Sequence, residues 1–335
     1  MTTIVFFNNK GGVGKTTLAY HLAHMFSRLG VPTLAVDLDP QANLTSAFLE
    51  EQDLELLWPE AGPSGSILQA LRPRLDGIGD IAEAPLRPVT DNLHLLCGDL
   101  GLSIFENELS QDWPKCADGN QPAFRTESAF FRIAANAAAK IQASLILIDV
   151  GPNLGAINRA ALLCANYLVI PLAADLYSLQ GLRNLGPTVR RWRSEWAERR
   201  KKNPNPALPL PSGEMRPAGY VIMQHPVRLD RPVKAYAKWA ARIPGEFYKS
   251  VLGRPVDEPI EAGNDPYCLA SLKNYRSLMP YSQEARKPMF DLKPADGAIG
   301  GHARAVEDCY GEFEELATSI AKACRITIPE PVIEF

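Results

Sequence analysis

The chain has 335 residues, of which 46% are hydrophobic and 22% are charged, and its formal net charge is −3. These values are typical of an ordinary soluble globular protein, and a chain of this length can bury a large core. No apolar run reaches the length of about 18 residues that a transmembrane helix needs, and the N-terminus lacks the basic region of a signal peptide, so we expect a cytoplasmic protein.

The first 40 residues predict a strand, a glycine-rich loop, a helix and a second strand. Residues 3–7 are a short apolar run rich in β-branched and aromatic side chains. Apolar residues then recur at helical spacing over residues 15–29, until Gly30 and Pro32 end the helix. The next buried strand is predicted at residues 33–38, and it runs into two aspartates, Asp37 and Asp39.

Later parts of the chain continue this alternation of strand and helix. Apolar strands are predicted at residues 93–97, 144–150, 167–172 and 219–224. Strands that are apolar throughout and are separated by helices predict an α/β fold, with a mostly parallel central sheet covered by helices on both faces.

Some segments interrupt the pattern. Residues 51–66, 111–123 and 201–217 are rich in Pro, Gly and polar side chains, so we interpret them as loops or insertions, and residues 243–275 show no clear pattern. We expect a single domain over residues 1–335, with insertions near 111–123, 201–217 and 243–275.

Cysteine and histidine positions do not favour a metal site. The six cysteines lie far apart and include no C-x-x-C pair, so free thiols are the simplest interpretation. His21 and His24 are three residues apart on the predicted helix, but no Cys, Asp or Glu follows at a matching spacing.

The segment after the first strand predicts a phosphate-binding loop. Gly14-Lys15-Thr16 matches the end of the pattern Gly, four free positions, Gly-Lys-Ser/Thr, whereas Asn9 occupies its first position. Two additional glycines offset this departure, because they let main-chain N–H groups curl around an anion. Lys15 would contact the β- and γ-phosphates of ATP, and Thr16 would be a ligand of Mg²⁺. The predicted nucleotide-binding residues are Gly11, Gly12, Val13, Gly14, Lys15, Thr16 and Thr17.

Lys10 carries a more specific signal. A lysine directly before the two glycines resembles the deviant Walker A loop of the ParA/MinD family of ATPases, in its ParA/Soj-like branch. The resemblance implies the P-loop NTPase fold of that family. In that family this lysine crosses to the nucleotide of the opposing subunit, so the resemblance implies a homodimer that forms on ATP binding. A second ammonium at the γ-phosphate would neutralise charge that develops in the transition state.

Three carboxylates complete the predicted site. Residues 145–149 are four apolar residues followed by Asp149, which is the Walker B form, and Asp149 would bind Mg²⁺ through water. The segment from Asp37 to Thr45 resembles the switch I region of the family. By that resemblance, Asp39 would position the attacking water and Asp37 would help to hold the Mg²⁺ shell. Lys10, Lys15 and Asp39 are therefore the predicted catalytic residues.

Basic residues distinguish the DNA-binding branch of this family from the membrane-binding branch. The last ten residues of the sequence contain two prolines and two glutamates, so we do not expect them to form the basic amphipathic helix of the membrane branch. Between residues 183 and 202, by contrast, eight Arg or Lys face two Glu. The predicted contacts to DNA of any sequence are Arg190, Arg191, Arg193, Arg199 and Arg200 in this run, and Arg228, Arg231, Lys234 and Lys238 in a second one.

The resemblance implies an ATP switch for partition or positioning of DNA or a protein cargo. ATP would drive dimerisation and non-specific DNA binding, and a partner protein would stimulate hydrolysis. One alternative is a metabolic enzyme of the same superfamily that uses ATP on a small molecule, as dethiobiotin synthetase does. Another is a metal-handling ATPase similar to the nitrogenase iron protein, although this would require a cysteine pair that the spacing does not suggest.

Overall fold

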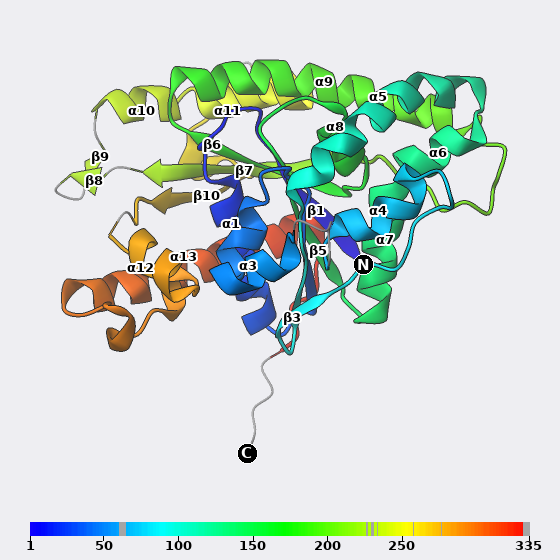
Figure 1. The fold of residues 1–335 in the computed structure, drawn as a ribbon. Helices are drawn as coiled ribbons and strands as arrows, with labels where there is room; N and C mark the ends of the chain where they lie inside the picture. Colours follow the sequence, from blue (N-terminus) through cyan, green and yellow to red (C-terminus); the bar gives the residue numbers. More distant parts are fainter. Residues whose placement is uncertain are drawn as a thin grey trace.

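The computed structural model describes residues 1–59, 65–225, 227–228, 231–232, 234–256, 258–275 and 277–330, without the side chains of 224–225, 227–228, 231–232 and 234–235. Within these residues one eight-stranded sheet forms the centre of the molecule, in the order β10-β7-β6-β1-β5-β2-β4-β3 (Figure 1). The strands are β1 (Thr2–Phe6), β2 (Thr33–Asp37), β3 (Arg87–Thr90), β4 (Leu93–Leu96), β5 (Leu145–Asp149), β6 (Tyr167–Ala173), β7 (Arg216–His225) and β10 (Cys268–Lys273).

All neighbouring strands of this sheet are parallel except β3 and β4. The predicted α/β class with a mostly parallel sheet is therefore confirmed. A separate two-stranded ribbon joins β8 (Val227–Arg228) to β9 (Arg231–Pro232).

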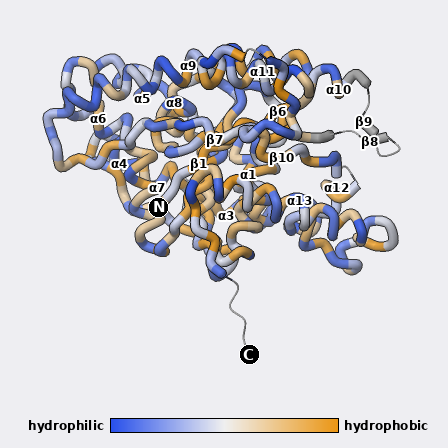
Figure 2. Tube along the Cα trace, turned by 180° about the vertical axis from the view of Figure 1, so that it is seen from behind, coloured by the Kyte–Doolittle hydropathy of each residue, from blue (hydrophilic) through white to orange (hydrophobic). Residues whose placement is uncertain are grey.

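Helices cover both faces of the sheet, because successive strand residues point to opposite sides and both sides are apolar. On β1, Val5 packs into one core and Ile4 into the other. The first core lies under α7 (Ala129–Lys140), α8 (Ala156–Leu163) and α9 (Leu176–Arg200), and the second under α1 (Lys15–Arg28) and α13 (Gly301–Cys324). The tube of α9 alternates between hydrophilic and hydrophobic residues, as expected for a helix with one buried face (Figure 2).

Shorter helices complete the fold. They are α2 (Asn43–Phe48), α3 (Glu51–Leu57), α4 (Ile67–Leu75), α5 (Phe105–Lys115), α6 (Gln121–Glu127), α10 (Lys234–Ala240), α11 (Ile243–Glu246) and α12 (Met279–Ala285), together with a π-helical turn, Phe247–Leu252. None of the helices in the described part of the chain is long and apolar enough to cross a bilayer.

The loop interpretation of residues 51–66 and 111–123 was wrong in part. Helix α3 occupies 51–57, and α5 and α6 occupy most of 111–123. Helix α3 begins with Glu51 and Asp53, whose charges favour a helix N-terminus, and Pro114 lies in the last turn of α5. Residues 243–275, which showed no pattern, hold α11, the π-helical turn and edge strand β10.

Candidate nucleotide site

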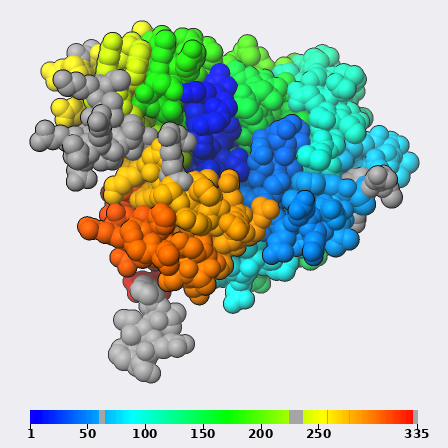
Figure 3. All heavy atoms as spheres, turned by 60° about the vertical axis from the view of Figure 1, so that its left-hand side comes forward, coloured from blue at the N-terminus to red at the C-terminus, as the bar shows by residue number. Residues whose placement is uncertain are grey.

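The carboxyl ends of the central strands bring the predicted loop and carboxylates together. In the sheet register, Phe6 at the end of β1 and Asp37 at the end of β2 both lie opposite Asp149 at the end of β5. A cleft of about 610 Å³ opens at this edge, lined by the loop and by residues of α1, α2 and α12. Figure 3 shows the dark-blue N-terminal segment at the surface, between the lighter blue of the following residues and the orange C-terminal segment.

The glycine loop has the backbone that its sequence predicts. Gly12 and Gly14 have φ angles of 70° and 85°, in the left-handed region that favours glycine. A Cβ atom on Gly14 would also lie 2.8 Å from Cε of Met223. Gly14 is the residue directly before α1, so the N–H groups of the loop and the positive end of the helix face the same cleft.

Lys15 is buried at the start of α1, with an exposed fraction of 7%. Its Nζ lies 3.5 Å from the carbonyl oxygen of Lys10. Burial lowers the pKa of Lys15, and the nearby carboxylates of Asp149 and Asp39 oppose that effect. A buried cation facing carboxylates is suited to an additional anion, because phosphate oxygens would complete its solvation.

Thr16 and Asp149 form the second part of the site. The Thr16 hydroxyl donates to Oδ2 of Asp149 at 2.6 Å, and Oδ1 of Asp149 is buried without a hydrogen-bond partner. Burial, with Asp37 nearby, raises the pKa of Asp149 to about 8. An orphaned carboxylate oxygen next to a hydroxyl fits a hydrated Mg²⁺. No group of three or more His, Cys, Asp or Glu among the described residues could hold a metal unaided.

Asp37 and Asp39 shape the loop between β2 and α2. Oδ2 of Asp37 accepts hydrogen bonds from the Thr45 amide at 2.8 Å and the Thr45 hydroxyl at 2.7 Å, and Oδ1 accepts from the Asp39 amide at 3.1 Å. Both oxygens of Asp37 are therefore engaged within its own loop. Asp39 is 6% exposed, accepts from the Gln41 amide at 3.0 Å and lines the cleft beside Lys15.

Lys10 is not among the residues that line the cleft. Its ammonium group forms an ion pair with Asp175, the residue before α9, and lies 5.8 Å from the centre of the Tyr177 ring. About a quarter of the side chain, 27%, is exposed. In this conformation Lys10 is held by its own chain, so the predicted crossing to an opposing subunit stays a prediction.

The arginines of α9 have several different environments. The Arg190 guanidinium donates to the carbonyl oxygens of Ser250 and Val251, and that of Arg193 donates to Met215 O. Arg199 lies 4.2 Å from the Trp113 ring centre, whereas the Arg191 side chain is 64% exposed. The side chains of three further predicted contacts, Arg228, Arg231 and Lys234, lie outside the described residues.

Sequence reasoning missed the other end of the cleft. One face of α12 lines it, with Met279, Ser282, Gln283 and Arg286 at helical spacing, opposite Tyr20 of α1. The spacing is visible in the sequence, but nothing local indicates that residues 279–286 pack near residue 20. Long-range packing of α12 places them there.

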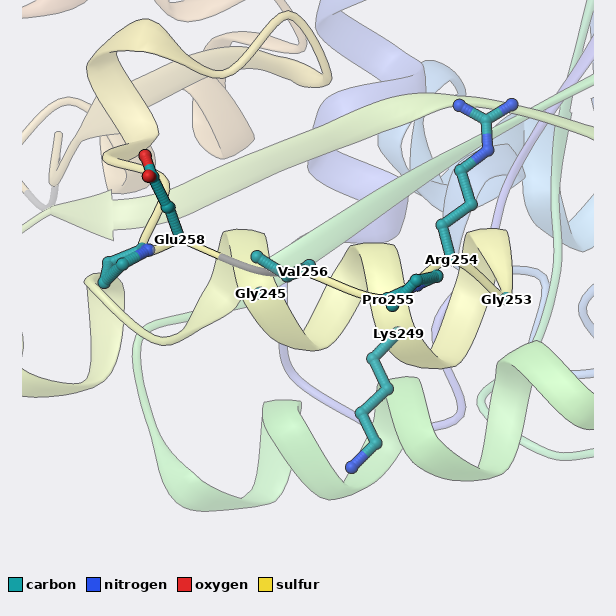
Figure 4. A pocket seen from close by; sticks show the side chains of 8 residues that line it. Gly245, Lys249, Gly253, Arg254, Pro255, Val256 and Glu258 are labelled. Carbon is teal, nitrogen blue, oxygen red and sulfur yellow. The ribbon is translucent and has the colours of Figure 1, made fainter.

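A second hollow, of about 620 Å³, lies beside the π-helical turn (Figure 4). It is lined by Gly245, Lys249, Gly253, Arg254 and Glu258, among others. In the figure Lys249 and Arg254 extend in opposite directions, so these two charged side chains do not converge on a common point. We therefore place the candidate site at the glycine loop.

Comparisons with known proteins agree with this geometry. A family profile described as an AAA domain matches residues 1–202. The chain is 31% identical over 188 residues to the sporulation initiation inhibitor protein Soj of Bacillus subtilis, a match that covers 56% of this chain and 64% of that relative. It is 33% identical over 194 residues to the chromosome-partitioning ATPase Soj of Treponema pallidum, covering 57% of this chain and 65% of that relative. These matches span less than two thirds of each relative.

Solved structures match over almost the whole chain. Protein DIP2308 of Corynebacterium diphtheriae has a TM-score of 0.72 at 25% identity, over 96% of this chain and 98% of that chain. The ATP complex of a McdA variant from Cyanothece has a TM-score of 0.63 at 18% identity, over 99% of both chains, which shows a shared fold. The chain belongs to the AAA-domain family that contains the ParA/Soj-like P-loop ATPases.

Proposed function

We propose that this protein is a ParA-like switch that binds and hydrolyses ATP at the cleft between α1, α2 and α12. The observation that carries the proposal is the meeting of Lys15, Thr16, Asp39 and Asp149 at one edge of the sheet. Lys15 would bind the β- and γ-phosphates, and the loop amides would surround them. Thr16 and Asp149 would hold Mg²⁺, which when bound supplies positive charge to the phosphates.

Hydrolysis would use Asp39 and the two lysines. Asp39 lines the cleft near Lys15, so its carboxylate can orient a water molecule toward the terminal phosphate. Asp37 would hold the loop that carries Asp39, through its bonds to Thr45. Lys10 would leave Asp175 and reach the nucleotide of a second copy of the chain, so ATP binding would favour a homodimer.

The cargo step would follow from dimerisation. Exposed basic side chains such as Arg191 would bind the phosphates of duplex DNA without reading sequence, and a partner protein would stimulate hydrolysis and release. The names of the relatives support this step, since two of them are described as Soj proteins of sporulation and chromosome partitioning.

Substitution of Asp39 by alanine tests the catalytic part. The variant should bind ATP with wild-type affinity, hydrolyse it at least about 100-fold more slowly and accumulate as a dimer, because only water positioning is lost. Single-turnover hydrolysis and sedimentation velocity with ATP would measure this. A hydrolysis rate equal to that of the wild type would remove Asp39 from the mechanism.

A shift assay with random-sequence duplex tests the DNA part, run with ATP, with ADP and without nucleotide at two salt concentrations. Binding should require ATP and weaken steeply with salt, because each phosphate contact contributes about 0.9 to the log–log slope. Arg191→Glu should weaken it, whereas Arg304→Glu, an equal charge change on the exposed side of α13, should not. Absence of binding at low salt with ATP would leave a switch that acts on a protein or a small molecule.

A further inference from the structure

Arg286 has a backbone conformation that is unfavourable for arginine. It follows the last residue of α12, and its φ and ψ angles of 51° and 39° lie in the left-handed region. Glycine is the usual residue at such a helix end, because a Cβ atom costs about 1 kcal/mol or more there. When a strained conformation is retained next to a cleft, the side chain is a candidate for a role that glycine cannot supply.

The Arg286 side chain joins two helices across the cleft. Its guanidinium group donates to the carbonyl oxygen of Ser46 on α2 and also lines the cleft. Helix α2 begins three residues after Pro40, and its first turn is held by the bonds from Thr45 to Asp37. Arg286 therefore holds the C-terminal half of the same short helix whose N-terminal half is fixed by the loop of Asp39.

The cleft between these helices contains a polar group without a partner. Tyr20 is 4% exposed and lines the cleft, and no described residue forms a hydrogen bond with its hydroxyl. On the α12 side, Ser282 and Gln283 line the cleft one turn before Arg286. Because the glycine loop occupies the other end, a nucleotide bound through its phosphates would place its nucleoside in this region.

We propose that Arg286 is the residue that positions the nucleoside half of the nucleotide, by clamping α2 to α12 around it. This inference rests on the proposed ATP function and adds a consequence for catalysis. The clamp connects the binding of the nucleoside to the position of the segment that carries Asp39. Binding of the nucleoside would therefore also align the attacking water that Asp39 orients.

The experiment compares Arg286→Gly with Arg325→Gly. Arg325 caps α13 with φ and ψ angles of 57° and 42°, so both changes relieve the same backbone strain, but Arg325 does not line the cleft. The melting temperature of each variant should stay within about 3 °C of wild type or rise, because glycine fits both positions. Arg286→Gly should bind MgATP about 10-fold or more weakly, whereas Arg325→Gly should bind it unchanged.

Inorganic tripolyphosphate separates the nucleoside from the phosphates. Its affinity should change less than about twofold in Arg286→Gly, because the glycine loop is intact, and the maximal ATP hydrolysis rate should also fall. Arg286→Lys, which keeps a donor for Ser46 O, should recover part of both losses. Unchanged ATP affinity in Arg286→Gly, or equal losses for ATP and tripolyphosphate, would overturn the clamp. Absence of ATP binding by the wild-type protein would instead overturn the proposed function.

Discussion

The phosphate end of the cleft and the basic helix α9 both contain positive side chains, yet the two regions differ in what those side chains contact. Lys15 is buried beside Asp39 and Asp149, and its Nζ lies 3.5 Å from the carbonyl oxygen of Lys10. On α9, Arg190 and Arg193 donate directly to main-chain carbonyl oxygens.

This difference shows that the number of basic residues in a segment does not establish a binding surface. A cation supplies affinity only to the extent that its hydrogen-bond donors are not already used by the fold. Lys15 lies at the start of α1, directly after the glycine loop, whereas Arg190 and Arg193 lie against main-chain carbonyl groups of neighbouring segments. The comparison predicts that substitutions at the phosphate end reduce ATP affinity, whereas substitutions on the buried side of α9 reduce the stability of the fold.

The largest effect is expected for Lys15→Ala. Loss of the buried ammonium group should weaken MgATP binding by about 1,000-fold, or about 4 kcal/mol, because the main counter-charge of the phosphates is gone. Lys10→Ala is the matched control, since it should keep ATP affinity and lose only dimerisation. Titration calorimetry and sedimentation would measure the two properties. Equal ATP affinity of Lys15→Ala and wild type would show that the phosphate end is misassigned.

On α9, the largest effect is expected for Gly186→Ala. A Cβ atom at Gly186 would lie 1.8 Å from the carbonyl oxygen of Ser250, in the same π-helical turn that Arg190 contacts. The clash should destabilise the protein by about 3 kcal/mol or more. Gly311→Ala in α13 has nothing within 4 Å of its new Cβ and should stabilise by about 0.5–1 kcal/mol. Urea unfolding of both variants would show whether the free energy of unfolding falls for Gly186→Ala and rises for Gly311→Ala.

Arg193 and Arg191 offer a smaller but more direct contrast. Arg193→Ala removes the donor to Met215 O and should destabilise the fold by about 2 kcal/mol. Arg191→Ala should change the free energy of unfolding by less than about 0.5 kcal/mol, because its side chain is mostly exposed. If Arg193→Ala were as stable as Arg191→Ala, the carbonyl contact would contribute nothing and both arginines would be free to bind phosphate.

The smallest effect concerns the outer part of α1. Burial, with His21 and Arg28 nearby, lowers the pKa of His24 to about 3. As the pH falls, the His24 imidazole is therefore protonated in the unfolded chain before it is protonated in the folded protein. The stability contributed by neutral His24 is complete above about pH 6.5 and is lost as the pH falls toward 3. His24→Phe should reduce the loss of stability between pH 7 and pH 5 by on the order of 1–2 kcal/mol. Denaturant unfolding of the variant and the wild type at both pH values would measure this. An equal loss of stability in the two proteins would contradict the account.

Much of the fold could be predicted from the sequence because its signals are local. The apolar strands, the glycine loop and the acid at position 149 each depend on a few adjacent residues, and parallel strands align their carboxyl ends without further information. Edge strands β3 and β10 were missed because β3 alternates in exposure and contains Pro88, and β10 lies within an irregular segment.

The nucleoside end of the cleft could not be predicted in the same way. Tyr20 and Arg286 are far apart in sequence and line the same cleft only because tertiary packing brings α12 beside it. The carbonyl partners of Arg190 and Arg193 are likewise set by tertiary packing, and the positions of basic residues in the sequence do not indicate them. Helix α5 was hidden by a composition rich in polar residues, although it buries Phe105, Leu109 and Trp113.

The position of β1 in the sheet has a consequence for folding during synthesis. β1 pairs with residues 145–149 on one side and residues 167–169 on the other. About 140 residues must therefore be synthesised after β1 before its partner β5 is complete, and more than 160 before β6 can cover the other edge. At usual rates of elongation these intervals are on the order of ten seconds. During that time its apolar residues and open hydrogen-bonding groups are exposed to other chains. Nucleotide cannot shorten this delay, because the loop that would bind it is not yet anchored between its neighbouring strands.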